Sequence, residues 1–101
     1  MNNTELNDII YLFVYNAIRE LFPRTRSIVI TPKTSFKDDL NLDSLDSTDF
    51  LLYIEEHFGE SIFDDDNIEE KEKFRKAMSG TIQDIVKFLI DITEQKGLKW
   101  V

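Results

Sequence analysis

Apolar side chains recur at helical spacing near the start of this sequence. From about Thr4 to Phe22 they return every three or four residues: Leu6, Ile9, Ile10, Phe13, Val14, Ala17, Ile18 and Leu21. Such a stripe is typical of an amphipathic helix with one buried face. Asn3 or Thr4 is suited to cap the start of this helix. Pro23 predicts its end, because proline lacks an N–H donor and disfavours helix in the residue before it.

A second helix is predicted from Ser44 to about Phe58. Its core positions recur at every fourth residue and are Phe50, Ile54 and Phe58. Asp43 is the natural N-cap, and Asp46 places a negative charge in the first turn, which the helix dipole favours. Gly59 is a typical C-terminal stop, because glycine adopts the left-handed conformation at little cost.

Two further helices are predicted in the C-terminal part. A short one runs from Ile68 to Ala77, and the last begins at Thr81 and ends at Gly97. Thr81 and Asp84 have the spacing of a capping box, and Asn67 with Glu70 has the same spacing before the short helix. The inward-facing positions predicted for the two helices are Phe74, Met78, Ile82, Ile85, Val86, Leu89 and Ile92.

The segment between Pro23 and Asn41 keeps no helical period and is predicted to be a long loop. Phe36 and Leu40 are its expected anchors in the core. The predicted fold is all-α: a small antiparallel four-helix bundle, three long helices and one short, with the long loop between helices 1 and 2. A single domain, 1–101, fits this length. One shared core is expected from Ile10, Phe13, Phe50, Ile54, Ile85 and Leu89.

The chain has 101 residues, a formal net charge of −8 and no cysteine. Nucleic acids and anionic membranes select basic surfaces, so this charge argues against either as a partner. The apolar run Ile9–Ile18 is too short to span a bilayer, and the polar start does not resemble a signal peptide. We expect a cytoplasmic protein, soluble and monomeric, whose thiol chemistry would have to come from a cofactor.

Acidic residues are concentrated in one stretch. Between Asp38 and Glu70 lie 13 of the 20 acidic residues, and no Lys or Arg. A run of charge is often only a solvated face, but so uneven a distribution favours a docking surface for basic proteins. The run Asp64–Asn67 does not fit a calcium loop, because Ile68 occupies the third ligand position. We therefore expect no dedicated metal site.

Ser44 is predicted to be exposed at the start of the second helix. A serine there can simply support the helix start, or it can serve as an attachment point. A catalytic serine needs a base, and the single histidine, His57, lies more than three turns along the same helix. The chain also lacks a Gly-x-Ser-x-Gly turn, a phosphate loop and a dinucleotide fingerprint. We expect no catalytic residues and no enzymatic activity of its own.

The block Phe36–Gly59, centred on Asp43-Ser44-Leu45, resembles the acyl carrier proteins. The resemblance implies that Ser44 carries a covalent 4′-phosphopantetheine arm, added from coenzyme A by a phosphopantetheinyl transferase. It implies a carrier that holds acyl groups as thioesters for fatty-acid-like, specialised lipid or polyketide biosynthesis. The sequence departs from the usual pattern at Asn41, where glycine is common, and at the bulky Phe50. These departures favour a specialised carrier.

The resemblance also implies a surface for partner enzymes. In this family the acidic face of the second helix meets basic patches on acyl-transferring and synthase enzymes. The residues carried over by position are Asp43, Leu45, Thr48, Asp49, Leu52, Glu55 and Glu56. The alternative is an unmodified acidic helical module that binds basic proteins without a cofactor. The sequence assigns no role to Trp100.

Overall fold

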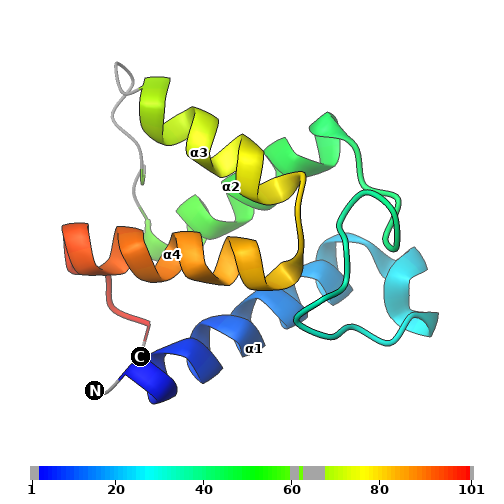
Figure 1. Ribbon diagram of the computed structural model, residues 1–101, viewed down its shortest axis with the longest axis horizontal. Helices are drawn as coiled ribbons and strands as arrows, with labels where there is room; N and C mark the ends of the chain where they lie inside the picture. Colours follow the sequence, from blue (N-terminus) through cyan, green and yellow to red (C-terminus); the bar gives the residue numbers. More distant parts are fainter. Residues whose placement is uncertain (1–2, 60–61, 63–67, 101) are drawn as a thin grey trace.

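The computed structural model describes residues 3–59, 62 and 68–100. The helices are α1 (Asn3–Leu21), α2 (Ser44–Phe58), α3 (Ile68–Met78) and α4 (Ile82–Lys96), with a short 3-10 helix η1 (Pro23–Ser27) (Figure 1). The described residues form no strand, only an isolated bridge between Ser35 and Thr81. The predicted all-α fold is confirmed. The proposed caps at Asn3, Thr4 and Asn67, and the run Asp64–Asn67, lie outside the described side chains.

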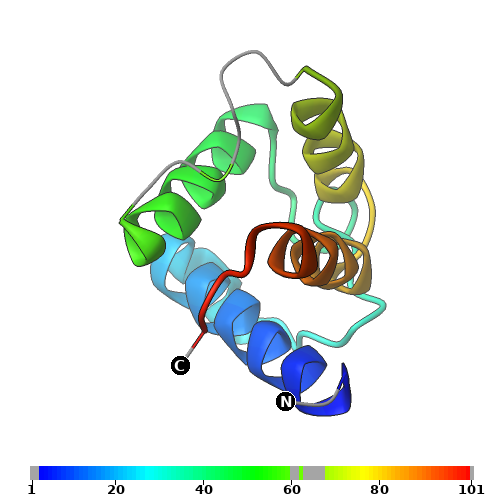
Figure 2. The same cartoon turned by 90° about the vertical axis from the view of Figure 1, so that its left-hand side faces the viewer.

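The four helices surround one core. Helix α4 packs along α1 and against α3, while α2 packs against α1. The two views show α4 in the middle of the molecule, with α1 on one side of it and α3 on the other (Figures 1 and 2). The long connection between α1 and α2 lies at the end of the molecule at which α2 begins (Figure 1).

Most of the positions that the periodicity predicted are buried in the core. Others are only half-buried and pack against it: Leu6, Ile9, Leu21 and Phe58. Side chains that are fully buried include Ile10, Val14, Ile18, Phe50, Ile54, Ile82, Ile85 and Leu89. Phe13 is half-buried and packs against this cluster at its edge. The inward-facing positions of α3, Phe74 and Met78, are also buried. The shared core is therefore confirmed.

Short-range signals set the ends of the helices. Asp43 caps α2, and Gly59 ends it with a left-handed φ of 73°. Thr81 and Asp84 form the capping box of α4, and Gly97 ends it with a φ of 67°. These boundaries agree with the prediction. Helix α1 ends at Leu21 and α3 reaches Met78, each one residue from the predicted end.

The long loop is tied to the junction between α3 and α4. Phe36 N–H donates to the carbonyl of Gly80 at 3.1 Å, and Ile82 N–H donates to the carbonyl of Thr34 at 3.0 Å. Phe36 and Leu40 are 1% and 2% exposed, which confirms them as the anchors of the loop. The loop contains η1, a short helical turn that the sequence pattern did not indicate.

Trp100 closes the other end of the bundle. Its side chain is only 9% exposed. Its indole Nε1–H donates to Thr93 Oγ at 2.8 Å, which satisfies the polar atom of a buried ring. The ring packs edge-on against Phe13 and Phe58 and stacks on His57. A residue to which the sequence assigned no role is therefore part of the packing.

The buried α2 stripe gives a stability prediction. Phe50→Ala removes a fully buried ring, so the free energy of unfolding should fall by about 3–5 kcal/mol. Leu52→Ala is the control, because Leu52 lies on the same helix and is 52% exposed. Its cost should stay within about 0.5 kcal/mol. Urea denaturation checks both values, and equal effects of the two changes would contradict the packing of α2.

Candidate functional site

Ser44 is the first residue of α2, and its side chain is exposed. Its carbonyl accepts a hydrogen bond from Thr48 Oγ1 at 3.2 Å. Among the described residues, nothing hydrogen-bonds to the Ser44 hydroxyl. The oxygen is therefore accessible to another molecule, and the helix does not depend on it for capping.

The cap of α2 is made by the residues on either side of Ser44. Asp46 N–H donates to Asp43 Oδ1 at 2.9 Å, and Asp43 N–H donates to Asp46 Oδ2 at 3.0 Å. The amide of Asp46 stabilises the charged carboxylate, so the pKa of Asp43 falls below its ordinary value of 3.8. This reciprocal pair fixes the backbone around Ser44.

Arg24 on η1 braces the same turn. Its guanidinium donates to Asp46 Oδ2 at 3.2 Å and approaches the carbonyl of Asn41 at 3.5 Å. Asn41 has a φ of 56°, the only left-handed non-glycine residue in the described part of the chain. Asparagine tolerates this conformation better than most residues, so the chain can adopt it here without a glycine. The contact joins residues 22 positions apart, and no local sequence signal indicated it.

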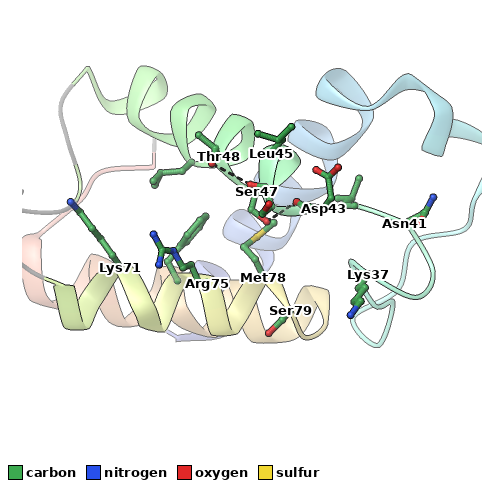
Figure 3. A pocket seen from close by; sticks show the side chains of 14 residues that line it. Lys37, Asn41, Asp43, Leu45, Ser47, Thr48, Lys71, Arg75, Met78 and Ser79 are labelled. Atoms are coloured by element: carbon green, nitrogen blue, oxygen red, sulfur yellow. Dashed lines mark hydrogen bonds between the residues drawn. The ribbon is translucent and has the colours of Figure 1, made fainter.

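A groove lies beside Ser44. Its volume is about 970 Å³, and it is lined by residues of the loop before α2, the first two turns of α2, and α3 (Figure 3). Lys37, Lys71 and Arg75 give it three cationic side chains. Its apolar lining includes Leu42, Phe74 and Met78, each less than 10% exposed. Sequence reasoning did not place α3 next to Ser44.

The proposed docking residues of α2 lie mostly in the open. Leu45 and Leu52 are 74% and 52% exposed. Thr48, Asp49 and Glu56 are exposed as well. Glu55 differs, because it is half-buried and its Oε2 accepts a hydrogen bond from the Ile62 amide at 3.1 Å. Glu55 therefore also holds the backbone at Ile62.

No group of three or more His, Cys, Asp or Glu side chains in the described part of the chain is placed to hold a metal ion. None of the described helices is long and apolar enough to cross a membrane. His57 packs against the rings of Phe13, Phe58 and Trp100, at the end of α2 away from Ser44.

Comparison with known proteins places the chain in a family. The family model described as phosphopantetheine attachment site matches residues 13–71, more than half of the chain. The acyl carrier protein of Thermosynechococcus vestitus is 42% identical over 60 residues, which cover 59% of this chain and 63% of that protein. The acyl carrier protein of Lactobacillus acidophilus is 33% identical over 79 residues, which cover 75% of this chain and 88% of that protein.

A third relative, the mitochondrial acyl carrier protein 2 of Arabidopsis thaliana, is 35% identical over 66 residues, 65% of this chain and 48% of that protein. The chain thus spans about half to two thirds of two of these relatives. No solved structure matches significantly. The chain belongs to the acyl carrier protein family, and its cofactor is a covalently attached 4′-phosphopantetheine.

The structure fits this cofactor. An exposed hydroxyl at the first residue of a 15-residue helix offers both an attachment atom and an environment that favours an anion. The attached group would place a phosphodiester there, with the cations of the groove close by. When bound, the group supplies the thiol that a chain without cysteine lacks.

The cap predicts a dependence of stability on pH. Because the pKa of Asp43 is lowered in the folded state, its carboxylate stabilises the fold above the unfolded pKa, and this contribution is lost as pH falls through the folded pKa. Asp43→Asn keeps a capping side chain but removes the charge. Wild type should therefore be the more stable protein at neutral pH, and the difference should shrink below about pH 4.

Thermal melts between acidic and neutral pH measure this difference. Asp49→Asn is the control, because it removes the same charge from an exposed position of α2 outside the cap. A gap between wild type and Asp43→Asn that persists unchanged at the acidic end would contradict the role of the ionised cap.

Proposed function

We propose that Ser44 is the residue that carries the 4′-phosphopantetheine arm, and that the protein is a non-catalytic acyl carrier. The observation that carries this proposal is the exposed Ser44 hydroxyl at the start of α2, inside the matched segment 13–71. The capping box supports it, because Asp43 and Asp46 hold the helix start without using Ser44. The serine is therefore available for modification at little cost to the fold.

The attachment chemistry requires a second protein. Ser44 Oγ forms a bond to the phosphorus next to the pantetheine part of coenzyme A, and the pyrophosphate bond breaks. Adenosine 3′,5′-bisphosphate leaves, and the hydroxyl proton passes to a base. No described group hydrogen-bonds to Ser44 Oγ, so a phosphopantetheinyl transferase must supply that base. The carrier contributes the nucleophilic oxygen and the surface that the transferase recognises.

The exposed part of α2 is the proposed surface for the transferase and for acyl-transferring and synthase enzymes. Leu45, Thr48 and Leu52 provide apolar and small side chains along the exposed part of α2, while Asp49 and Glu56 provide charge. Exposed acids attract basic patches and accelerate encounter more than they add to affinity. Asp43 and Glu55 belong to the same surface, but each also has a structural hydrogen bond.

Two aromatic rings in the core support the proposal that the carrier serves a specialised biosynthetic pathway. Phe36 and Phe50 are both buried, with ring centroids 6.3 Å apart. One of these two rings, Phe36, is an anchor of the long loop, and the other belongs to α2. A core filled in this way leaves less room for a long saturated chain than small aliphatic residues would. We therefore propose that the acyl group belongs to a specialised lipid or polyketide route.

Attachment is tested with coenzyme A, magnesium and a broad-specificity phosphopantetheinyl transferase. Wild type should gain the mass of one phosphopantetheine on Ser44, and Ser44→Ala should gain none. Because the Ser44 hydroxyl has no partner among the described residues, Ser44→Ala should change the free energy of unfolding by no more than about 0.5 kcal/mol.

Ser47→Ala is the matched control, since Ser47 lies on the same turn and should leave modification intact. Failure of wild type to react with several transferases, while remaining folded, would favour the unmodified interaction module. Modification of Ser44→Ala would place the attachment on another residue.

Docking is tested by charge reversal. Asp49→Lys with Glu56→Lys should slow association with the transferase, by about tenfold or more at low ionic strength. The loss should shrink as salt screens the field. Asp91→Lys with Glu94→Lys makes the same change of net charge at exposed positions of α4 and is the control. Stopped-flow association rates measure the effect. If both double variants slow association equally, net charge alone would explain the loss and α2 would not be a specific docking surface.

A further inference from the structure

Arg24 on η1 contacts both sides of the turn that carries Ser44. Its Nη2 donates to Asp46 Oδ2 at 3.2 Å, on the helix side of Ser44. The same nitrogen approaches the carbonyl of Asn41 at 3.5 Å, on the loop side. One guanidinium therefore links the two ends of residues 41–46, which we call the attachment turn.

The backbone that carries Arg24 is fixed, because η1 is hydrogen-bonded to α1. Arg19 of α1 donates from Nη1 to the carbonyl of Thr25 at 2.5 Å and from Nη2 to that of Ile28 at 2.6 Å. Hydrogen bonds from a charged donor are stronger than those between neutral groups. Thr25 is fully buried, and its Oγ1 donates to the carbonyl of Phe22 at 2.7 Å. The position of η1 relative to α1 is therefore set by several contacts at once.

The guanidinium of Arg24 is itself held by a ring. Its Cζ lies 5.6 Å from the ring centre of Phe22, which is only 3% exposed. A cation over an aromatic face is attracted to it, which favours this orientation of the side chain. The Arg24 side chain is nevertheless 54% exposed, and an exposed ion pair adds little to stability. The pair with Asp46 is therefore better suited to orient the attachment turn than to stabilise the fold.

The capping box sets only the second half of the attachment turn. Asp43 and Asp46 hydrogen-bond to each other's amides. Asn41 lies before the box and has a left-handed φ of 56°, which is less favourable than a right-handed conformation for residues other than glycine. Arg24 contacts the carbonyl of Asn41 and the carboxylate of Asp46, so it joins this less favourable residue to the fixed half of the turn.

We propose that Arg24 is a positioning residue for the modification of Ser44. By linking Asn41 to Asp46, it holds the attachment turn in a single arrangement in which Ser44 Oγ is presented to the transferase. There Oγ bonds to the phosphorus next to the pantetheine part of coenzyme A, the nucleotide part leaves, and the proton passes to a base of the transferase. A hydroxyl held at a defined position reacts in more of its encounters than one that moves. The inference rests on the proposed function, because it concerns the reaction of Ser44.

This role predicts a split between kcat and KM for the transferase in Arg24→Gln. With the carrier as the varied substrate, kcat should fall by about threefold or more, because fewer bound carriers present Ser44 Oγ correctly. The KM for the carrier should stay equal or fall, because the variant is more acidic and attracts a basic partner at least as well. The melting temperature should change little, because the ion pair is exposed.

Arg26→Gln is the matched control. Arg26 is exposed on the same short helix, and none of the described hydrogen bonds or ion pairs involves it. Its change removes the same charge and should leave kcat at the wild-type value. Arg24→Lys keeps the charge and a donor group without the planar fork, so it should recover part of the kcat lost in Arg24→Gln.

Amide relaxation of the apo protein by NMR gives a readout that does not need the transferase. The order parameters of residues 41–46 should fall in Arg24→Gln and stay at their wild-type values in Arg26→Gln. This inference alone would be overturned by an unchanged kcat in Arg24→Gln, by a loss that appears only in KM, or by an equal loss of kcat in Arg26→Gln. The absence of any added mass at Ser44 in wild type would overturn the proposed function and the inference together.

Discussion

The backbone hydrogen bonds between the long loop and the junction of α3 and α4 are the constraint on which the site depends. A loop of this length has a large conformational entropy, which packing and hydrogen bonds must offset. Thr34 and Phe36 exchange hydrogen bonds with Ile82 and Gly80, and the buried Phe36 ring fixes the same point in the core. These contacts therefore fix the position of the loop, and with it the position at which α2 begins. Ser44, the first residue of α2, lines the groove as a consequence.

The charged side chains around the start of α2 differ in position and in hydrogen-bond partners. Asp43 and Asp46 are used in the cap, and Arg24 braces that cap from η1. Farther along α2, the exposed acids Asp49 and Glu56 do not line the groove, whereas Lys37, Lys71 and Arg75 do. The described charges around the start of α2 are thus divided between the helix cap, the exposed surface of α2 and the groove.

The sequence predicted best what depends on neighbouring residues. The caps of α2 and α4, the glycine stops and the buried stripes follow from spacings of three or four residues, and the structure has them at the expected positions. Contacts between residues that are far apart in the sequence leave no local spacing pattern from which to predict them. Trp100 packs on Phe13 and His57 only because the fold brings these residues together. The groove was missed for the same reason, since Ser44 and Arg75 line it together only in the folded structure.

The central claim is that this chain acts through a group attached to Ser44. Mass spectrometry of the intact protein, isolated from the cells that naturally make it and fragmented to locate any added group, tests that claim most directly. The account predicts a population that carries one 4′-phosphopantetheine, free or acylated, with the added mass on Ser44. A protein that is folded and functional in those cells but has only its unmodified mass, or carries the group on another residue, would contradict it.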